Sequence, residues 1–385
     1  MVYHSARRTA ALALEDGRIF AGRSFGAPVE SDGEVVFTTC MTGYQEIATD
    51  PSFRGQLVCL TYPIIGNYGV TPGDDESRQP WVSALIVRDY VDEPSHWQMT
   101  GTLDDYLKEN GIPGITGVDT RALTRHIRTR GLVRGVLVPD RTGMTDGELI
   151  AKARGASLTS DIDAVGDVSV RESRDYDAPL DGPHVVVLDC GLKENIVRSL
   201  VARGVRVTVV PHDMPYAAVR ALDPDGVLCS PGPGDPENAQ EAVETVRQVL
   251  ENGTPYAGVC LGHQLLALAI GAKTSRLPFG HRGGNHPVLD LVTGQVRVTS
   301  QNHGFKVEPD SIPTADGWRV AHLNLNDGSV EGLMHDAMPA FSIQYHPEGA
   351  PGPQDSQDLF DRFLTMVEHC RSARQEPSLP HGSDA

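Results

Sequence analysis

The sequence predicts an α/β protein with two domains: a C-terminal open, mostly parallel sheet with helices on both faces, and an N-terminal domain of mixed α and β structure. From residue 184 onward, short apolar runs alternate with stretches of helical character, and strands separated by helices form parallel sheets. Residues 9 to about 140 instead alternate β-like runs with turns. A chain of 385 residues is long enough to bury two separate cores.

The N-terminal domain, residues 1–160, begins with an apolar stretch at 9–14 that the acidic turn Glu15–Gly17 interrupts. We interpret this stretch as a first strand and hairpin turn rather than as a signal peptide. Further strand-like runs are expected at 34–39, 56–62 and 82–87.

Three helices are expected in the same domain. The first begins near Thr102 and stops before Gly111, and the second is capped by Asp119 and stops at Gly131. The third begins with the capping box Thr145–Glu148. Because none of these elements brings a nucleophile next to a base, the residues alone assign no catalytic role to this domain.

The C-terminal domain is expected at residues 183–372, after a polar, acidic linker at 161–182. Its strands are predicted at 184–189, 205–210, 226–229 and 255–259, and its helices at 193–203, 215–222 and 237–252. In sheets of this kind the active site lies at the carboxyl ends of the strands. Residues 373–385 are predicted to form a disordered tail.

Composition and charge restrict the partners of the chain. No apolar run approaches the roughly 18 residues that a membrane-spanning helix needs. The formal net charge of −18 argues against a nucleic-acid partner, because phosphate binding requires a basic surface. None of the six cysteines forms a Cys-x-x-Cys pair, which favours a reducing, cytoplasmic location.

The strongest chemical signal is Cys260, which ends an apolar run and stands between two glycines, directly before a helical pattern. This is the pattern of a nucleophile elbow, a sharp strand-to-helix turn that exposes one reactive side chain. Gly258 and Gly262 permit the turn and the close approach of a substrate. At a helix N-terminus the thiolate form of Cys260 is favoured. A buried structural cysteine is the alternative interpretation, and the residues downstream argue against it.

Those residues are His346 and Glu348, which follow a strand-like run at 339–345. If the chain leaves extended geometry at Pro347, His346 can accept the proton of Cys260 while Glu348 fixes the tautomer of the imidazole. Any such three-residue string is weak evidence by itself. Cys260 and His346 support each other as candidates, because each follows a predicted strand and is therefore expected at the carboxyl ends of the sheet strands.

A third candidate is the loop 230–236, which is too rich in glycine and proline to be helix or strand. It follows the predicted strand at 226–229 and precedes a helix near Glu237. Backbone N–H groups of its glycines, together with the N–H of Leu261, are expected to form an oxyanion hole. An ordinary strand-to-helix turn is the alternative for this loop alone.

Taken together, these residues resemble a known family. Cys260, His346 and Glu348 match the triad of class I glutamine amidotransferases. The strings at 258–269, 279–288 and 301–305 are similar to the small, glutaminase subunit of carbamoyl-phosphate synthetase. The N-terminal half resembles the same subunit in the strings at 42–46, 50–52, 60–63, 66–67 and 118–124. The resemblance covers roughly residues 8 to 370 and implies a class I glutamine amidotransferase-like fold for the C-terminal domain.

The resemblance implies that the substrate is L-glutamine, whose side-chain amide is hydrolysed through a thioester on Cys260. Carried over position by position, the glutamine-binding residues are Gly232, Gly234, Leu261, Gln264, Asn302, Gly304, Phe305 and Cys40. At Cys40 the family usually has a serine, and a thiol is the weaker hydrogen-bond partner.

The resemblance also implies a partner, the large subunit of carbamoyl-phosphate synthetase, which receives the ammonia and uses bicarbonate and ATP. This chain has no phosphate-binding Gly-x-x-x-x-Gly-Lys-Ser/Thr motif, so no cofactor is expected in it. ATP and its metal ion are expected on the large subunit. His281, His286 and His303 are scattered along the chain, and no metal site is predicted.

Two other functions remain open from the sequence. A stand-alone cysteine hydrolase of γ-glutamyl or peptide bonds would not need the first 150 residues or a partner. A catalytically inactive regulatory subunit would not need Cys260, His346 and Glu348.

Overall fold

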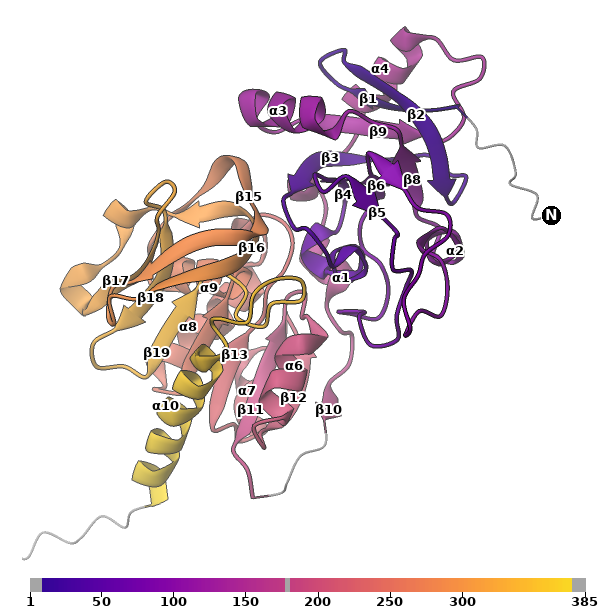
Figure 1. Cartoon of the computed structure of the whole chain (residues 1–385). Coiled ribbons are helices and arrows are strands. Elements are labelled where there is room, and N and C mark those ends of the chain that lie inside the picture. The colour runs from indigo at the N-terminus through magenta and orange to yellow at the C-terminus, as the bar shows by residue number, and fades with distance from the viewer. Residues whose placement is uncertain (1–8, 177–180, 376–385) are drawn as a thin grey trace, which may run out of the picture.

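The computed structural model describes residues 9–176 and 181–375, which form two bodies packed side by side (Figure 1). Residues 1–8 lie outside the described part, as do residues 177–180 of the expected linker and residues 376–385 of the predicted tail. Residues 373–375 belong to the last helix instead, so the expected start of the disordered tail was too early.

The N-terminal body is a closed seven-stranded barrel, with the strand order β1-β2-β8-β6-β4-β3-β9. The barrel strands are β1 (Thr9–Leu14), β2 (Ile19–Gly26), β3 (Ser31–Thr38), β4 (Gln56–Leu60), β6 (Ala84–Ile86), β8 (Pro113–Thr116) and β9 (Arg134–Val138). A short ribbon of β5 (Ile64–Ile65) and β7 (Asp89–Tyr90) lies beside it. The first hairpin, β1–β2, is antiparallel as predicted. Closure of the barrel was not foreseen.

Four helices cover the barrel: α1 (Tyr44–Thr49), α2 (Leu103–Glu109), α3 (Thr120–Arg130) and α4 (Asp146–Arg154). The caps predicted for α3 and α4 are present, from Asp119 and from the capping box of Thr145 with Glu148. Alternation along β1 explains the layers: Leu12 faces the barrel core, and Ala13 packs toward Leu149 of α4.

The C-terminal body is built on a ten-stranded sheet of order β10-β12-β11-β13-β14-β19-β18-β17-β15-β16. Its strands are β10 (Arg174–Tyr176), β11 (His184–Asp189), β12 (Arg206–Pro211), β13 (Gly226–Cys229), β14 (Tyr256–Val259), β15 (Thr274–Asp290), β16 (Val296–Val307), β17 (Trp318–Asn324), β18 (Val330–His335) and β19 (Ala340–Ile343). Strands β12, β11, β13, β14 and β19 are parallel. The predicted α/β class is therefore confirmed.

Helices cover both faces of the parallel strands, as predicted: α6 (Glu194–Val201), α7 (Tyr216–Ala221), α8 (Gln240–Glu251), α9 (Leu261–Ala269) and α10 (Asp358–Gln375). Alternate residues of β11 face opposite sides. Val186 joins a core with Val246 of α8 and Leu265 of α9. Val187 joins a second core with Leu200 of α6 and Phe363 of α10. The parallel strands are thus buried on both faces, which explains their continuous apolar runs.

Two features extend this sheet beyond the prediction. The long strands β15 and β16, with β17 and β18, add an antiparallel half to one edge. At the other edge β10, from the segment expected to be a linker, pairs with β12. The same segment holds the short helix α5 (Ala164–Val168), whose Val165 reaches the core. The expected linker is therefore partly built into the C-terminal body.

Within residues 9–176 and 181–375, no helix combines the length and the apolar character that crossing a bilayer requires.

Replacing Thr145 by alanine should lower the free energy of unfolding by about 1 kcal/mol, because it removes the cap of α4. The Thr145 hydroxyl accepts a hydrogen bond from the Glu148 N–H at 3.3 Å, and the Glu148 carboxylate accepts one from the Thr145 N–H at 2.8 Å. Urea denaturation measures the change. The matched control is Thr129→Ala on the exposed side of α3, for which less than about 0.5 kcal/mol is expected. Equal losses for both variants would contradict the capping argument.

Candidate active site

Cys260 lies at the turn between β14 and α9, with backbone angles φ 53 and ψ −102. Positive φ is costly for a residue with a side chain and persists only where the surroundings enforce it. The Cys260 N–H donates to the Ile343 carbonyl of β19 at 2.8 Å. The thiol lies 3.6 Å from the carbonyl oxygen of Asn302 on β16. The turn has the geometry of the predicted elbow and places Cys260 against the end of β19 and the middle of β16.

The two flanking glycines are required by close backbone contacts. A Cβ atom on Gly262 would lie 2.3 Å from the carbonyl oxygen of Cys229, and one on Gly258 would lie 2.5 Å from the Gly262 carbonyl oxygen. Helix α9 therefore begins directly against the ends of β13 and β14. This contact, rather than local flexibility, explains the Gly-x-Cys-x-Gly spacing.

His346 follows β19, and its imidazole Nδ1 lies 2.7 Å from Oε1 of Glu348. The His346 N–H donates to the Ser300 carbonyl of β16 at 2.9 Å, which fixes the chain as it leaves the sheet. The other ring nitrogen, Nε2, is buried and has no hydrogen-bond partner among the described residues. The structure thus brings Cys260, His346 and Glu348 together at the carboxyl ends of the parallel strands β14 and β19.

Sequence reasoning missed Lys193, a buried residue at the start of α6. Its Nζ lies 3.1 Å from Oε1 of Glu348 and donates to the Gly349 carbonyl at 2.6 Å. The side chains of Lys193 and Glu348 are 2% and 0% exposed, so each charge depends on the other for compensation. The sequence signals only a lysine at the first position of the helix predicted at 193–203.

These charges shift the pKa values of the site. Burial alone would raise the pKa of Glu348, but Lys193 and His346 outweigh it and lower that pKa to about 2. Burial alone would lower the pKa of His346, but Glu348 and Cys260 outweigh it and raise that pKa to about 10. The arrangement favours a carboxylate beside a protonated imidazole, which is the state that a proton donor to a leaving group needs.

A cavity opens in front of Cys260 between the two bodies. Of the residues predicted to bind substrate, those that line it are Gly232, Gly234, Gln264, Asn302, Gly304 and Phe305. Leu261 and Cys40 do not line it. Cys40 is half-buried, its thiol faces Gly284, and burial raises its pKa.

The glycine-rich loop lines the cavity and packs closely on the residue after β11, because a Cβ on Gly232 would lie 2.1 Å from the Cys190 carbonyl oxygen. Gly234 has a φ of 92, which favours glycine. On the opposite wall Gln264 donates to the Phe305 carbonyl at 3.1 Å and to Gln344 at 3.0 Å. Both walls are therefore fixed by contacts of their own.

The N-terminal body also lines the cavity, which the sequence did not indicate, through Glu34, Ser52, Gln56 and Thr159. Glu34 lies 3.5 Å from the guanidinium of Arg276, which comes from β15. Asn302 donates to the buried Asp50 carboxylate of the N-terminal body at 2.9 Å. The binding wall is thus shared by both bodies.

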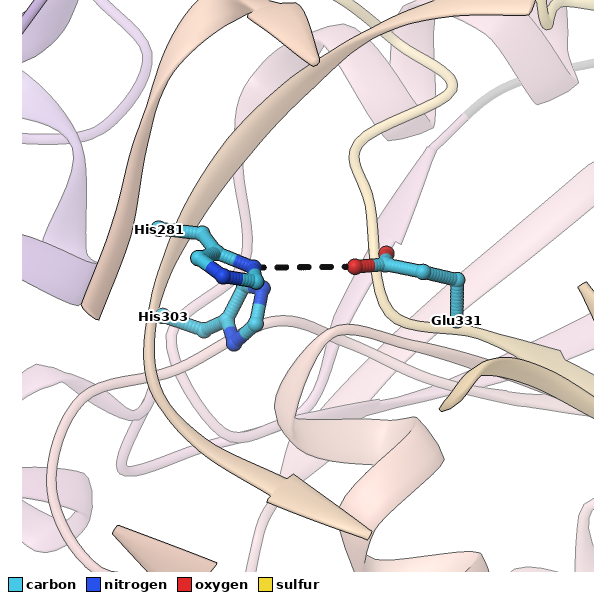
Figure 2. Close-up of side chains that lie close together, drawn as sticks. All are labelled: His281, His303 and Glu331. Atoms are coloured by element: carbon cyan, nitrogen blue, oxygen red, sulfur yellow. Dashed lines mark ion pairs between the residues drawn. The ribbon is translucent and has the colours of Figure 1, made fainter. Parts of the chain in front are cut away.

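His303, which also lines the cavity, belongs to a buried cluster with His281 and Glu331, whose nitrogen and oxygen atoms lie within 4.8 Å of one another (Figure 2). The ring centroid of His281 lies 5.3 Å from that of His286 and 5.0 Å from that of His303, so the three histidines that are scattered along the sequence lie together in the fold. His281 Nδ1 also lies 3.7 Å from Glu331 Oε1. Both ring nitrogens of His303 already have partners, in the Phe305 carbonyl at 2.7 Å and Gln301 at 2.9 Å. We therefore interpret the cluster as a hydrogen-bonded network that fixes β16; the absence of a metal site stays a prediction.

Comparison with known proteins yields two matching families. A model described as "Carbamoyl-phosphate synthase small chain, CPSase domain" matches residues 12–137, and one described as "Glutamine amidotransferase class-I" matches residues 186–366. The chain is 51% identical over 361 residues to the carbamoyl phosphate synthase small chain of Symbiobacterium thermophilum, covering 92% of this chain and 98% of that protein. It is 50% identical over 364 residues to the protein of the same name from Methanopyrus kandleri, covering 94% and 99%.

Gly262→Ala should destabilise the protein by about 1–3 kcal/mol, because the new methyl group meets the Cys229 backbone, which has no room to move. Gly147→Ala is the matched control, since it lies in the first turn of α4 and its nearest atom is 4.0 Å away. That variant is expected to be neutral or slightly more stable. Urea denaturation compares the two, and an unaffected Gly262 variant would refute the contact argument.

The pH dependence of stability tests the charge state of His346. Because its folded pKa of about 10 lies above its ordinary value of about 6.5, its stabilisation is complete below pH 6.5 and is lost as the pH rises through 10. His346→Asn should therefore cost roughly 3 kcal/mol more at pH 7 than at pH 10.

Urea denaturation of both proteins at the two pH values measures this difference. His369→Asn, on the exposed side of α10, serves as the control and should show none. An equal cost for His346→Asn at both pH values would mean that the imidazole is not held protonated.

Proposed function

The chain belongs to the carbamoyl phosphate synthase small-chain family and carries a class I glutamine amidotransferase domain, and from this premise we propose that it hydrolyses L-glutamine through Cys260, His346 and Glu348. The supporting observation is the strained elbow cysteine, which lines a cavity and interacts with the imidazole of a buried His346–Glu348 pair. A structural cysteine would need none of these.

In the proposed reaction the Cys260 thiol gives its proton to His346, and the thiolate sulfur attacks the side-chain amide carbon of glutamine. His346 gives a proton to the departing nitrogen, which leaves as ammonia, and a thioester remains on Cys260. Water, losing a proton to His346, then cleaves the thioester to glutamate and restores the thiol. Glu348 holds the imidazole through Nδ1 and stabilises its protonated form. N–H groups of the 232–234 loop and of Leu261 are the proposed donors to the tetrahedral oxyanion.

The cavity offers groups that suit the amino-acid end of this substrate. Glu34 and Arg276 bring opposite charges to it, which complement the α-amino and α-carboxylate groups of glutamine. We place glutamine against Gly232, Gly234, Gln264, Asn302, Gly304 and Phe305. Cys40 is a less direct candidate, because it does not line the cavity.

The proposed partner is the large subunit of carbamoyl phosphate synthase, in a heterodimer in the cytoplasm. It receives the ammonia and makes carbamoyl phosphate with ATP and bicarbonate, for arginine and pyrimidine synthesis. Ammonia released into water at neutral pH is mostly ammonium, which is not a nucleophile, so a transfer path that excludes water has a chemical purpose. ATP and its metal ion are assigned to that subunit.

Cys260→Ser should abolish glutamine hydrolysis, since the weaker serine nucleophile is poorly activated by this base. The complex with the large subunit should still form carbamoyl phosphate from an ammonium salt. The measurement is carbamoyl phosphate formed from glutamine and from ammonium, with the wild-type and variant chains. Cys370→Ser, far along α10, is the control and should leave both rates unchanged. Glutamine hydrolysis by the pure Cys260 variant would refute the nucleophile assignment.

A further inference from the structure

We propose that Glu76 of the N-terminal body is a positioning residue for the triad, acting through the first turn of α6. The inference rests on the proposed glutaminase function and deepens it, because it names the contact by which the N-terminal body supports catalysis. Glu76 is 1% exposed, yet it lies in the loop between β5 and β6, far along the chain from every triad residue.

The N-terminal body holds Glu76 firmly. The Glu76 N–H donates to the Thr49 hydroxyl at 2.9 Å, at the end of α1. Gln45 of the same helix accepts from the Thr71 N–H at 2.9 Å and donates to Asp75 at 2.9 Å. Helix α1 therefore fixes the 71–77 loop at both ends, which gives the family-like string at 42–46 a structural purpose.

Toward the C-terminal body, Glu76 supplies the cap that α6 lacks. Lys193 occupies the N-cap position and makes no side-chain capping bond. Instead the Glu76 carbonyl accepts from the Glu194 N–H at 2.8 Å, and its carboxylate accepts from the Asn195 N–H at 3.1 Å. Arg198, one turn later, donates to the same carboxylate at 3.0 Å. Unsatisfied N–H groups at a helix start need such acceptors, and here another body provides them.

The turn that Glu76 caps holds Glu348 at two points. Lys193 contacts the Glu348 carboxylate at 3.1 Å, and the Asn195 side-chain amide donates to the Glu348 backbone carbonyl at 2.6 Å. Glu348 in turn holds His346. A shift of the α6 start would thus move both the charge partner and the backbone anchor of the carboxylate that orients the imidazole.

Glu76 does not line the cavity, so its contribution is predicted to appear in turnover and not in substrate binding. Glu76→Gln keeps the shape but removes the charge, and leaves an amide N–H₂ facing either Arg198 or the Asn195 N–H. We expect kcat for glutamine hydrolysis to fall about tenfold, equivalent to about 1.4 kcal/mol, with KM within about twofold of wild type.

The experiment measures kcat and KM of the full-length chain in complex with the large subunit, for Glu76→Gln, for Glu348→Gln and for the double variant. If Glu76 acts through Glu348, the loss caused by Glu76→Gln should largely vanish in the Glu348→Gln background. Arg54→Gln is the matched control: it breaks a 3.0 Å ion pair from the N-terminal body to Asp167 that does not involve α6, and kcat should not change.

Three results would overturn the proposal. Glu76→Gln would lower kcat equally in the wild-type and Glu348→Gln backgrounds, it would change KM alone, or it would lower ammonium-dependent synthesis as much as glutamine hydrolysis. If Glu76→Gln does not fold, Arg198→Gln takes its place in the same cycle, since it removes one partner of the carboxylate and should give a smaller loss of the same kind. Absence of glutamine hydrolysis by the wild-type complex would instead refute the proposed function itself.

Discussion

The buried contact between Lys193 and Glu348 is the interaction on which the rest of the site depends. A carboxylate that is fully removed from water is strongly disfavoured unless a partner compensates its charge. Lys193 provides that charge, and His346 is oriented by the carboxylate oxygen that Lys193 also contacts. Removal of one member of such a pair typically costs about 3–5 kcal/mol, so the lysine is needed for the fold of the site as well as for its chemistry.

The sheet explains why these groups meet. Cys260 follows β14 and His346 follows β19, and the two strands are parallel neighbours. Their carboxyl ends therefore lie side by side, and the loop after β13 approaches from the next position. The antiparallel half contributes the opposite wall through Asn302, Gly304 and Phe305 of β16. The long strand β16 thereby lies opposite the carboxyl ends of the parallel strands.

Most of the parallel half could be predicted from the sequence, because strands buried on both faces give continuous apolar runs and glycine marks the elbow. The candidate triad could be recognised for the same reason, because Cys260 and the His346–Glu348 pair follow such strands. The barrel, the antiparallel half and the wall from the N-terminal body were not found, since they depend on pairing between distant segments. Lys193, Glu76 and Glu34 carry no local signal, because a buried charge is recognisable only once its partner is known.

The hydrogen bond between Asn302 and Asp50 joins positions 252 residues apart along the chain. Both residues are buried, and Asn302 supplies the donor to one Asp50 oxygen while the Ser52 N–H donates to the other at 2.9 Å. A substitution at either position therefore changes a contact made by the other half of the chain. A chimera that joins the barrel of one family member to the amidotransferase half of a distant one would keep every proposed catalytic residue, yet the cavity wall between the two bodies would be assembled from residues that do not match.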